Sequence, residues 1–384
     1  MKKRFLMTPG PTQIPPEVLL ASAQPIIHHR TAEYSELFAR TIEGLKYVFQ
    51  TDNDIFFLAS SGTGAMESAV VNLCSPGDEV LICSSGKFGE RWQQLAETYG
   101  LLARVLDYPY GSPVDPEDIA SSLTAHDGIK VVFVTHSETS TGVVNDIETI
   151  GDIVDKTDAV LVADSISGMG SAELRTDSWH VDVAVAGSQK ALMLPPGLAF
   201  VSVSDKAWEL VKQSTLPRYY FDWRKARAVI RQDKPTTPFT PAVSLTVALD
   251  SSLAMIREEG LDNLFRRHRA MGRATREAVK ALGLELFSPD EERCSSVTAV
   301  KVPDGIDDAE LRRLMLDRFG VQLAGGQGTM KGEIIRVGHC GFYNYSDIIV
   351  TITALELALK TLGYPIEIGS GVSRAEAIFA EEAS

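Results

Sequence analysis

The chain has 384 residues, of which 44% are hydrophobic and 23% are charged, and its formal net charge is −14. This length exceeds what one small core accommodates, so we expect a large and a small domain. The acidic balance argues against nucleic acid and anionic membranes as main partners, because both bind basic surfaces.

Two further absences in the sequence narrow the class of protein. No apolar run approaches the roughly 18–20 residues that cross a bilayer, so no membrane partner is expected. No pair of cysteines has CxxC spacing; they are Cys74, Cys83, Cys294 and Cys340. This pattern predicts a reduced, cytoplasmic setting and no metal site.

The N-terminal residues 1–20 are expected to form an arm. Residues 8–12, Thr-Pro-Gly-Pro-Thr, are Pro or Gly at three of five positions, which excludes regular helix and central strand. A helix capped by Thr31 is expected through Phe49. The polar run before it fits either plain surface or a wall near a pocket mouth; it consists of His28, His29 and Arg30.

Residues 54–73 predict a strand, a turn of small residues and a helix. The turn is Ser61-Gly62-Thr63-Gly64. Such a turn offers backbone N–H groups and the positive end of a helix to a phosphate. It matches neither GK[ST] nor GxGxxG. A plain tight turn with Ser or Thr as helix cap explains this segment equally well.

Strands and helices alternate from about residue 54 to 204. The expected strands include 79–83, 101–106 and 130–135, and the expected helices include 116–122 and 147–155. This alternation predicts a mainly parallel sheet covered by helices, with a site at the carboxyl ends of the strands. Two features fall at such ends: Phe88, on a turn between glycines, and the polar cluster 136–142, which contains Ser140.

Asp164 and Lys190 each follow an apolar strand and give the sharpest functional signal. Lys190 lies within apolar sequence, and burial favours a neutral amine that can form a Schiff base. An Asp and a Lys at neighbouring strand ends could hold pyridoxal phosphate between them. The alternative is an Asp that caps a helix and a Lys that reaches solvent.

The remaining chain is expected to complete the large domain and then form the small one. Residues 212–241 are predicted irregular and functional, and 244–282 helical with a break near Gly260. Arg336 stands in an apolar strand and must find an anion, either a substrate carboxylate or a buried acidic residue. The predicted boundaries are an arm 1–20, a large domain 21–255, a small α+β domain 256–368 and a loosely helical tail 369–384.

Taken together, these residues resemble the class V aminotransferases, in particular the alanine–glyoxylate and serine–glyoxylate (serine–pyruvate) group of fold type I pyridoxal phosphate enzymes. The resemblance runs from Pro9 to Leu362. Its most specific part is Gly-Ser-Gln-Lys-Ala-Leu at 187–192, followed by Pro-Pro-Gly at 195–197. It implies an α/β fold with a mainly parallel, seven-stranded sheet and a smaller α+β domain.

The resemblance also implies a role for each matching residue. Lys190 forms the Schiff base with pyridoxal phosphate and carries the proton, and Asp164 holds the pyridinium nitrogen. The phosphate is held by Ser61, Gly62, Thr63 and Gln189 of the same chain, and by Thr240 from a neighbouring subunit. The ring is contacted by Phe88, where many relatives have tryptophan, and by Ser140 and Ile166. The substrate carboxylate is bound by Arg336, with Gly10 and Ser140.

The implied function is a ping-pong transamination. An amino group moves from alanine or serine to glyoxylate or pyruvate, in a homodimer with shared active sites. One alternative keeps the reaction but uses aspartate, phosphoserine or ureidoglycine as donor, with His28, His29 and Arg30 around the extra group.

Two hypotheses lie outside transamination. A cysteine desulfurase would need a mobile cysteine loop, whereas Cys340 directly follows the Arg336 strand and Gln189 replaces the histidine expected there. An idle scaffold or accessory subunit would not require the intact set of Asp164, Lys190 and Arg336.

Overall fold

The computed structural model describes residues 3–289 and 296–382, so Cys294 lies outside the described residues. Its centre is one seven-stranded sheet in the order β2-β10-β9-β8-β5-β3-β4. All strands are parallel except β10, which is antiparallel to both neighbours. This confirms the predicted α/β class. The strands are β2 (Asp54–Leu58), β3 (Glu79–Ser84), β4 (Leu102–Asp107), β5 (Ile129–Thr135), β8 (Val160–Asp164), β9 (Val183–Gly187) and β10 (Ala199–Val203).

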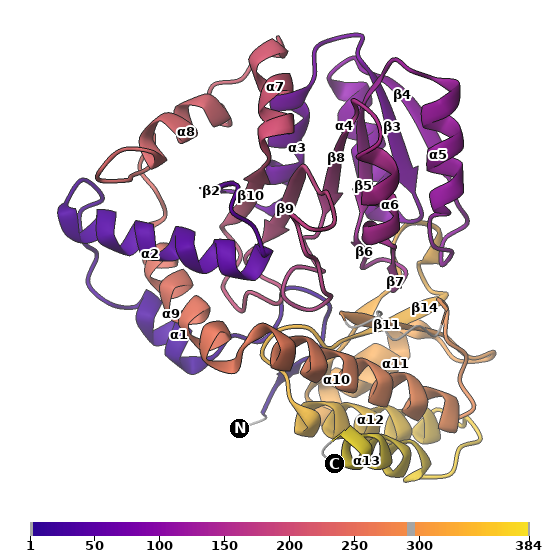
Figure 1. Ribbon diagram of the computed structural model, residues 1–384. Coiled ribbons are helices and arrows are strands. Elements are labelled where there is room, and N and C mark those ends of the chain that lie inside the picture. Colours follow the sequence, from indigo (N-terminus) through magenta and orange to yellow (C-terminus); the bar gives the residue numbers. More distant parts are fainter. Residues whose placement is uncertain (1–2, 290–295, 383–384) are drawn as a thin grey trace.

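Helices cover both faces of this sheet (Figure 1). Successive side chains of a strand point to opposite faces, and β2 sends Ile55 and Phe57 to one core and Phe56 and Leu58 to the other. The first core includes α2 (Ala32–Phe49), α5 (Pro116–Ala125), α6 (Ile147–Val154) and α9 (Val243–Glu259). The second includes α3 (Gly62–Leu73), α4 (Lys87–Thr98), α7 (Asp205–Gln213) and α8 (Trp223–Ile230).

A third core belongs to the C-terminal part. Its sheet has the order β11-β14-β13, and its helices lie below the large sheet in Figure 1. The strands are β11 (Val297–Lys301), β13 (Ala324–Gly325) and β14 (Ile334–Gly338). The helices are α10 (Leu261–Ala281), α11 (Asp308–Leu314), which continues as a π-helical turn (Met315–Phe319), α12 (Tyr345–Thr361) and α13 (Ser370–Glu382).

The arm is tied to this C-terminal part. Strand β1 (Phe5–Leu6) pairs in parallel with β12 (Val321–Gln322), and Met7 is buried in the third core. A short helix, α1 (Pro16–Ser22), follows and runs past residue 20. The proposed division of the chain at residue 255 stays a prediction.

Two sequence expectations were wrong in detail. The segment 212–241 is not irregular throughout, because α8 forms where Asp222 caps the helix by accepting from Arg224 N and Trp223 is buried. Phe88 lies in the first turn of α4 rather than on a flexible turn. The break at Gly260 is confirmed, since this residue ends α9 with a φ of +80°.

The tail is a packed helix rather than a loose one. Helix α13 lies against α10 and α12. The buried carboxylate of Glu356 on α12 accepts from Gly369 N at 2.7 Å, Gly371 N at 2.9 Å and Val372 N at 3.1 Å. These donors are at the beginning of α13, which therefore docks by its N-terminus.

We predict that Glu356→Gln weakens this docking, because the amide directs N–H groups at N–H groups. The free energy of unfolding should fall by about 1–3 kcal/mol, as measured by urea denaturation. Glu376→Gln, at an exposed position on α13, is the matched control. Equal effects of the two substitutions would contradict the assignment.

Candidate active site

Asp164 and Lys190 lie at neighbouring strand ends. Strands β8 and β9 pair in parallel, with Asp164 opposite Val185. Asp164 Oδ1 accepts from Ile166 N at 2.9 Å, and its side chain is buried. Lys190 follows β9 by three residues and is also buried. The two groups thus share one edge of the sheet.

The arm closes over Lys190. Nζ of Lys190 donates to the Pro9 carbonyl at 2.6 Å. A Cβ atom on Gly10 would stand 2.2 Å from that Nζ, and Gly10 has a φ of +137°. Only glycine therefore fits beside the amine. The expected substrate contact at Gly10 is untested, but this residue lies directly at the lysine.

Burial shifts both titratable groups away from their charged forms. It raises the pKa of Asp164 to about 7, and the negative charge of Glu138 adds to this rise, while the Ile166 N–H opposes it. Burial lowers the pKa of Lys190, and the positive charge of Arg336 also acts in this direction. The lysine is therefore biased toward the neutral amine, as the sequence predicted.

Ser61, Gly62 and Thr63 at the N-terminus of α3, together with Gln189, form a group that we call the cradle. Polar atoms of Ser61 and Gln189 remain available to bind a ligand there. Ser61 is the exposed N-cap residue, and its hydroxyl makes no capping hydrogen bond. Gly62 packs so closely that a Cβ would lie 2.5 Å from Ile166 Cδ1. Gln189 Oε1 is buried and has no hydrogen-bond partner in the part of the chain that the structure describes. An anion held at a helix N-terminus fits these groups, so the cradle suits the phosphate of pyridoxal phosphate.

A cation beside the cradle was missed by the sequence analysis. Arg91 donates to Thr63 Oγ1 at 3.1 Å, and its guanidinium carbon lies 4.8 Å from the centre of the Phe88 ring. Its charge lowers the pKa of Asp164. Helical spacing places Arg91 one turn after Phe88, but only the packing of α4 against α3 brings it to Thr63.

Two residues that are expected to contact the ring, Phe88 and Ser140, lie at the N-terminus of α4. Phe88 is half-buried, and Ser140 is fully buried. The Ser140 hydroxyl accepts from Lys87 N at 3.0 Å and donates to Glu138 Oε1 at 2.5 Å. Glu138 was also missed, although it lies in the polar cluster that the sequence singled out.

Arg336 is a buried guanidinium whose hydrogen-bond partners among the described residues are carbonyl groups. It donates from Nε to Gly325 O at 2.9 Å and from Nη1 to Thr139 O at 2.8 Å. Within residues 3–289 and 296–382 no carboxylate forms an ion pair with it. Burial lowers its pKa to about 10, which the negative charge of Glu138 partly offsets. A buried cation that forms no ion pair among the described residues suits a ligand carboxylate.

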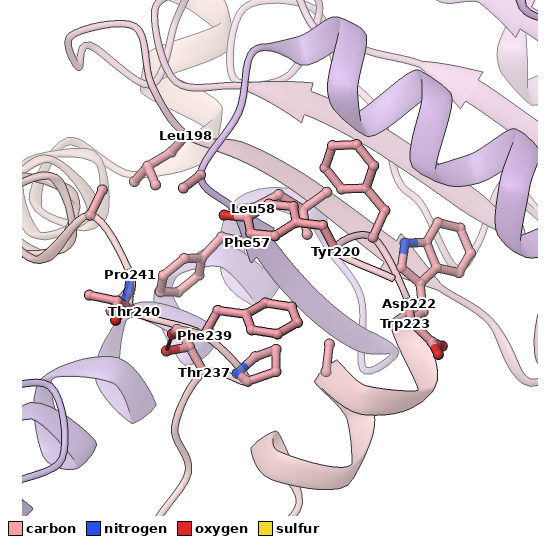
Figure 2. A pocket seen from close by; sticks show the side chains of 15 residues that line it. Phe57, Leu58, Leu198, Tyr220, Asp222, Trp223, Thr237, Phe239, Thr240 and Pro241 are labelled. Carbon is pink, nitrogen blue, oxygen red and sulfur yellow. Dashed lines mark hydrogen bonds between the residues drawn. The ribbon is translucent and has the colours of Figure 1, made fainter. Parts of the chain in front are cut away.

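Thr240 lies two residues before Ala242, the N-cap residue of α9. It is exposed and lines an aromatic pocket with Phe57, Tyr220 and Phe239 (Figure 2). It also lines a second hollow, together with His28 and His29. Arg30 donates to Thr237 O at 2.8 Å nearby. The structure therefore groups the His-His-Arg run with Thr240.

We predict that Asp164 lowers the free energy of unfolding of the cofactor-free protein in a pH-dependent way. Its pKa is about 7 when folded and about 4 when unfolded, so the folded form binds the proton more tightly. Relative to Asp164→Asn, the wild type should lose roughly 2–4 kcal/mol of stability as pH rises from about 4 to 7, with no further loss above about 8. Urea unfolding at several pH values measures this difference, and a difference that does not vary with pH would contradict it.

The chain matches the model of the Aminotransferase class-V family over residues 4–348. It is 44% identical to the soluble hydrogenase small subunit of Synechococcus sp., covering 98% of each chain. It is 38% identical to L-aspartate–glyoxylate aminotransferase of Paracoccus denitrificans, over 97% of this chain and 95% of the relative. It is 36% identical to serine–glyoxylate aminotransferase of Methylorubrum extorquens, over 99% and 96%.

Solved structures are similar over nearly the whole chain. Ureidoglycine–glyoxylate aminotransferase from Bacillus subtilis has a TM-score of 0.94 at 29% identity, covering 99% of each chain. Alanine–glyoxylate aminotransferase from Nostoc sp. has a TM-score of 0.89 at 30% identity, covering 94% of this chain and 96% of that one. The family model and these relatives show that the chain belongs to the class-V aminotransferase family and is an enzyme that uses pyridoxal phosphate.

Proposed function

We propose that this enzyme transfers the amino group of a small amino acid, serine or alanine, to glyoxylate or pyruvate. The observation that carries the proposal is Arg336, a buried guanidinium with no ion pair among the described residues, whose charge acts on Lys190. A substrate carboxylate bound there would place its α-carbon near the lysine amine. The serine–glyoxylate relative supports this choice of donor.

Different residues of the chain would bind the cofactor and transfer the proton. Bound pyridoxal phosphate supplies an aldehyde that bonds to amines and a protonated ring that withdraws electrons from the substrate carbon. The α3 N-terminus, Ser61 and Thr63 hold its phosphate, and the Asp164 carboxylate holds the proton on its ring nitrogen. The neutral amine of Lys190 would take the proton from the substrate Cα and deliver it to the cofactor carbon that becomes aminated, and in the second half of the cycle it would carry a proton in the opposite direction.

We propose a homodimer in which Thr240 reaches the phosphate cradle of the partner subunit. Large apolar side chains are exposed around this residue: Ile26, at 73% exposure, borders the same hollow, and Tyr219, at 72%, packs on Phe239. A second copy would cover them.

We also retain the cytoplasm as the expected compartment, since Cys74, Cys83 and Cys340 are free thiols.

Aspartate is the second candidate donor, because one relative is named L-aspartate–glyoxylate aminotransferase. In the proposed dimer, His28, His29 and Arg30 would accompany Thr240 to the partner's site. Arg30 would supply the positive charge that a second carboxylate needs.

An accessory role is the alternative outside catalysis, since two relatives are named as hydrogenase subunits. Asp164, Lys190 and Arg336 are together in one buried site, which supports catalysis instead. Loss of the visible absorbance of bound cofactor on adding alanine, serine, aspartate, phosphoserine or glutamate separates the two functions and ranks the donors. A silent screen with cofactor bound would favour the accessory role.

We predict that Arg336→Lys raises the KM for the amino donor about 10- to 100-fold, with a smaller change in kcat. Lysine cannot form the paired hydrogen bonds of a guanidinium with a carboxylate. Steady-state kinetics with the fastest donor measures the split. Arg318→Lys, an exposed arginine in the same domain, should change neither constant, and an unchanged KM in Arg336→Lys would remove Arg336 from substrate binding.

We predict that Lys190→Ala and Thr240→Ala complement each other in hybrid dimers. Lys190→Ala should be inactive, and Thr240→Ala should bind cofactor about tenfold more weakly. In a hybrid, the site built on the Thr240→Ala chain keeps its lysine and receives Thr240 from the partner subunit. Activity at limiting cofactor should rise after mixing and dissociation. No gain in mixtures shown to contain hybrids would mean that Thr240 does not act across the interface.

A further inference from the structure

Glu138 is a fully buried carboxylate that none of the roles above uses. It ends the two-residue strand β6 (Ser137–Glu138), which pairs with β7 (Val143–Val144) beside the large sheet. Isolated ionised groups are rarely buried, because desolvation costs several kcal/mol. The surroundings of Glu138 must therefore compensate its charge.

Four hydrogen bonds provide this compensation. Oε2 accepts from Phe88 N at 3.0 Å and Gly89 N at 3.1 Å. Oε1 accepts from Ser140 N at 3.2 Å and Ser140 Oγ at 2.5 Å. The Ser140 oxygen already accepts from Lys87 N, so its own proton points at Glu138. Burial raises the pKa of Glu138, and the hydrogen bonds from Ser140, Gly89 and Phe88 oppose that rise. Because these partners are all donors and no acceptor faces Glu138 among the described residues, the geometry fits the carboxylate ion.

The same bonds fix the beginning of α4. Gly86 is the N-cap residue and has no side chain with which to cap, so Glu138 takes that role for the N–H groups of Phe88 and Gly89. A Cβ on Gly86 would stand 2.5 Å from Glu138 Cδ and 2.7 Å from Ser140 Oγ. Gly86 therefore makes room for the carboxylate, and the positive helix end favours its charge.

Arg336 is coupled to the same group. Its Nη1 donates to the carbonyl of Thr139, the residue between Glu138 and Ser140. Movement of residues 138–140 would therefore move the carbonyl that orients the guanidinium. The carboxylate also supplies negative charge near Arg336 without forming an ion pair with it. The guanidinium is thus oriented and stays available for a ligand.

We propose that Glu138 is a positioning residue for the transamination proposed above. As a carboxylate ion it holds the α4 N-terminus with Phe88, the Ser140 hydroxyl and, through Thr139, the guanidinium of Arg336 in one arrangement. It touches neither substrate nor cofactor in this role. Its loss should weaken two properties together: the affinity for the cofactor and the preference for amino donors that carry a carboxylate.

Glu138→Gln tests this role, because glutamine keeps the shape but turns an N–H toward backbone N–H groups. Two readouts are needed. The dissociation constant of pyridoxal phosphate, titrated into cofactor-free protein, should rise about tenfold. The ratio of kcat/KM for serine to that for ethanolamine, which lacks only the carboxylate, should fall about tenfold or more. Alanine and ethylamine form a second pair.

Glu90→Gln is the matched control on the same helix. Glu90 binds Lys87 Nζ and the Tyr110 hydroxyl, and its substitution should leave both readouts within about twofold. A merely structural role of Glu138 would lower the rates with serine and ethanolamine equally. An unchanged ratio, or an unchanged cofactor affinity, in folded Glu138→Gln would overturn the proposal.

Gly86→Ala decides the question if Glu138→Gln does not fold. It keeps the charge but displaces the carboxylate, and both readouts should move in the same direction as for Glu138→Gln. If neither moves, Glu138 is not a positioning residue. Wild-type protein that responds to no amino acid would refute the transaminase function itself, and the cofactor titration would still test Glu138.

Discussion

The burial of Lys190 is the constraint around which the site is arranged. An ammonium ion at this position would lose its hydration, so the group is biased toward the neutral amine. Its Nζ retains one hydrogen bond, to the Pro9 carbonyl. The arm must therefore lie over β9, and the pairing of β1 with β12 anchors that arm to the C-terminal part. The environment of the buried amine thus depends on a contact between segments about 180 residues apart.

Two helix N-termini meet at the carboxyl edge of the sheet and are used differently. At α3 the N-cap hydroxyl of Ser61 makes no capping bond, so the positive end is available to a phosphate. At α4 the buried carboxylate of Glu138 already occupies the corresponding position. The bond from Arg91 to Thr63 links the two helices. The N-terminus of α3 is thus available to a ligand, whereas the N–H groups at the N-terminus of α4 bind Glu138.

The charges of the site are balanced across elements rather than in pairs. Arg336 and Arg91 bring positive charge, whereas Asp164 and Glu138 bring negative charge, and none of the four forms an ion pair among the described residues. Each guanidinium instead binds neutral oxygens, the carbonyls of Gly325 and Thr139 or the Thr63 hydroxyl. The charged ends therefore stay available to an anionic substrate and a cofactor that carries both signs.

The sequence alone determined the features that follow from local periodicity. Alternating apolar strands and amphipathic helices predicted a parallel sheet, and polar residues directly after those strands predicted where Asp164 and Lys190 meet. The break at Gly260 was also determined locally, since a φ of +80° favours glycine. The sequence did not predict α8, because its stability depends on burying Trp223 in the second core.

Only the tertiary structure shows the contacts of Glu138, Arg91 and Glu356. Each binds a group far away in the sequence: Glu138 reaches Phe88 across 50 residues, and Arg91 reaches Thr63 across 28. Residue type and spacing do not encode such contacts, because they arise when separate elements pack on one sheet. Local patterns therefore fix which groups lie at the strand ends, and packing decides which partners these groups meet there.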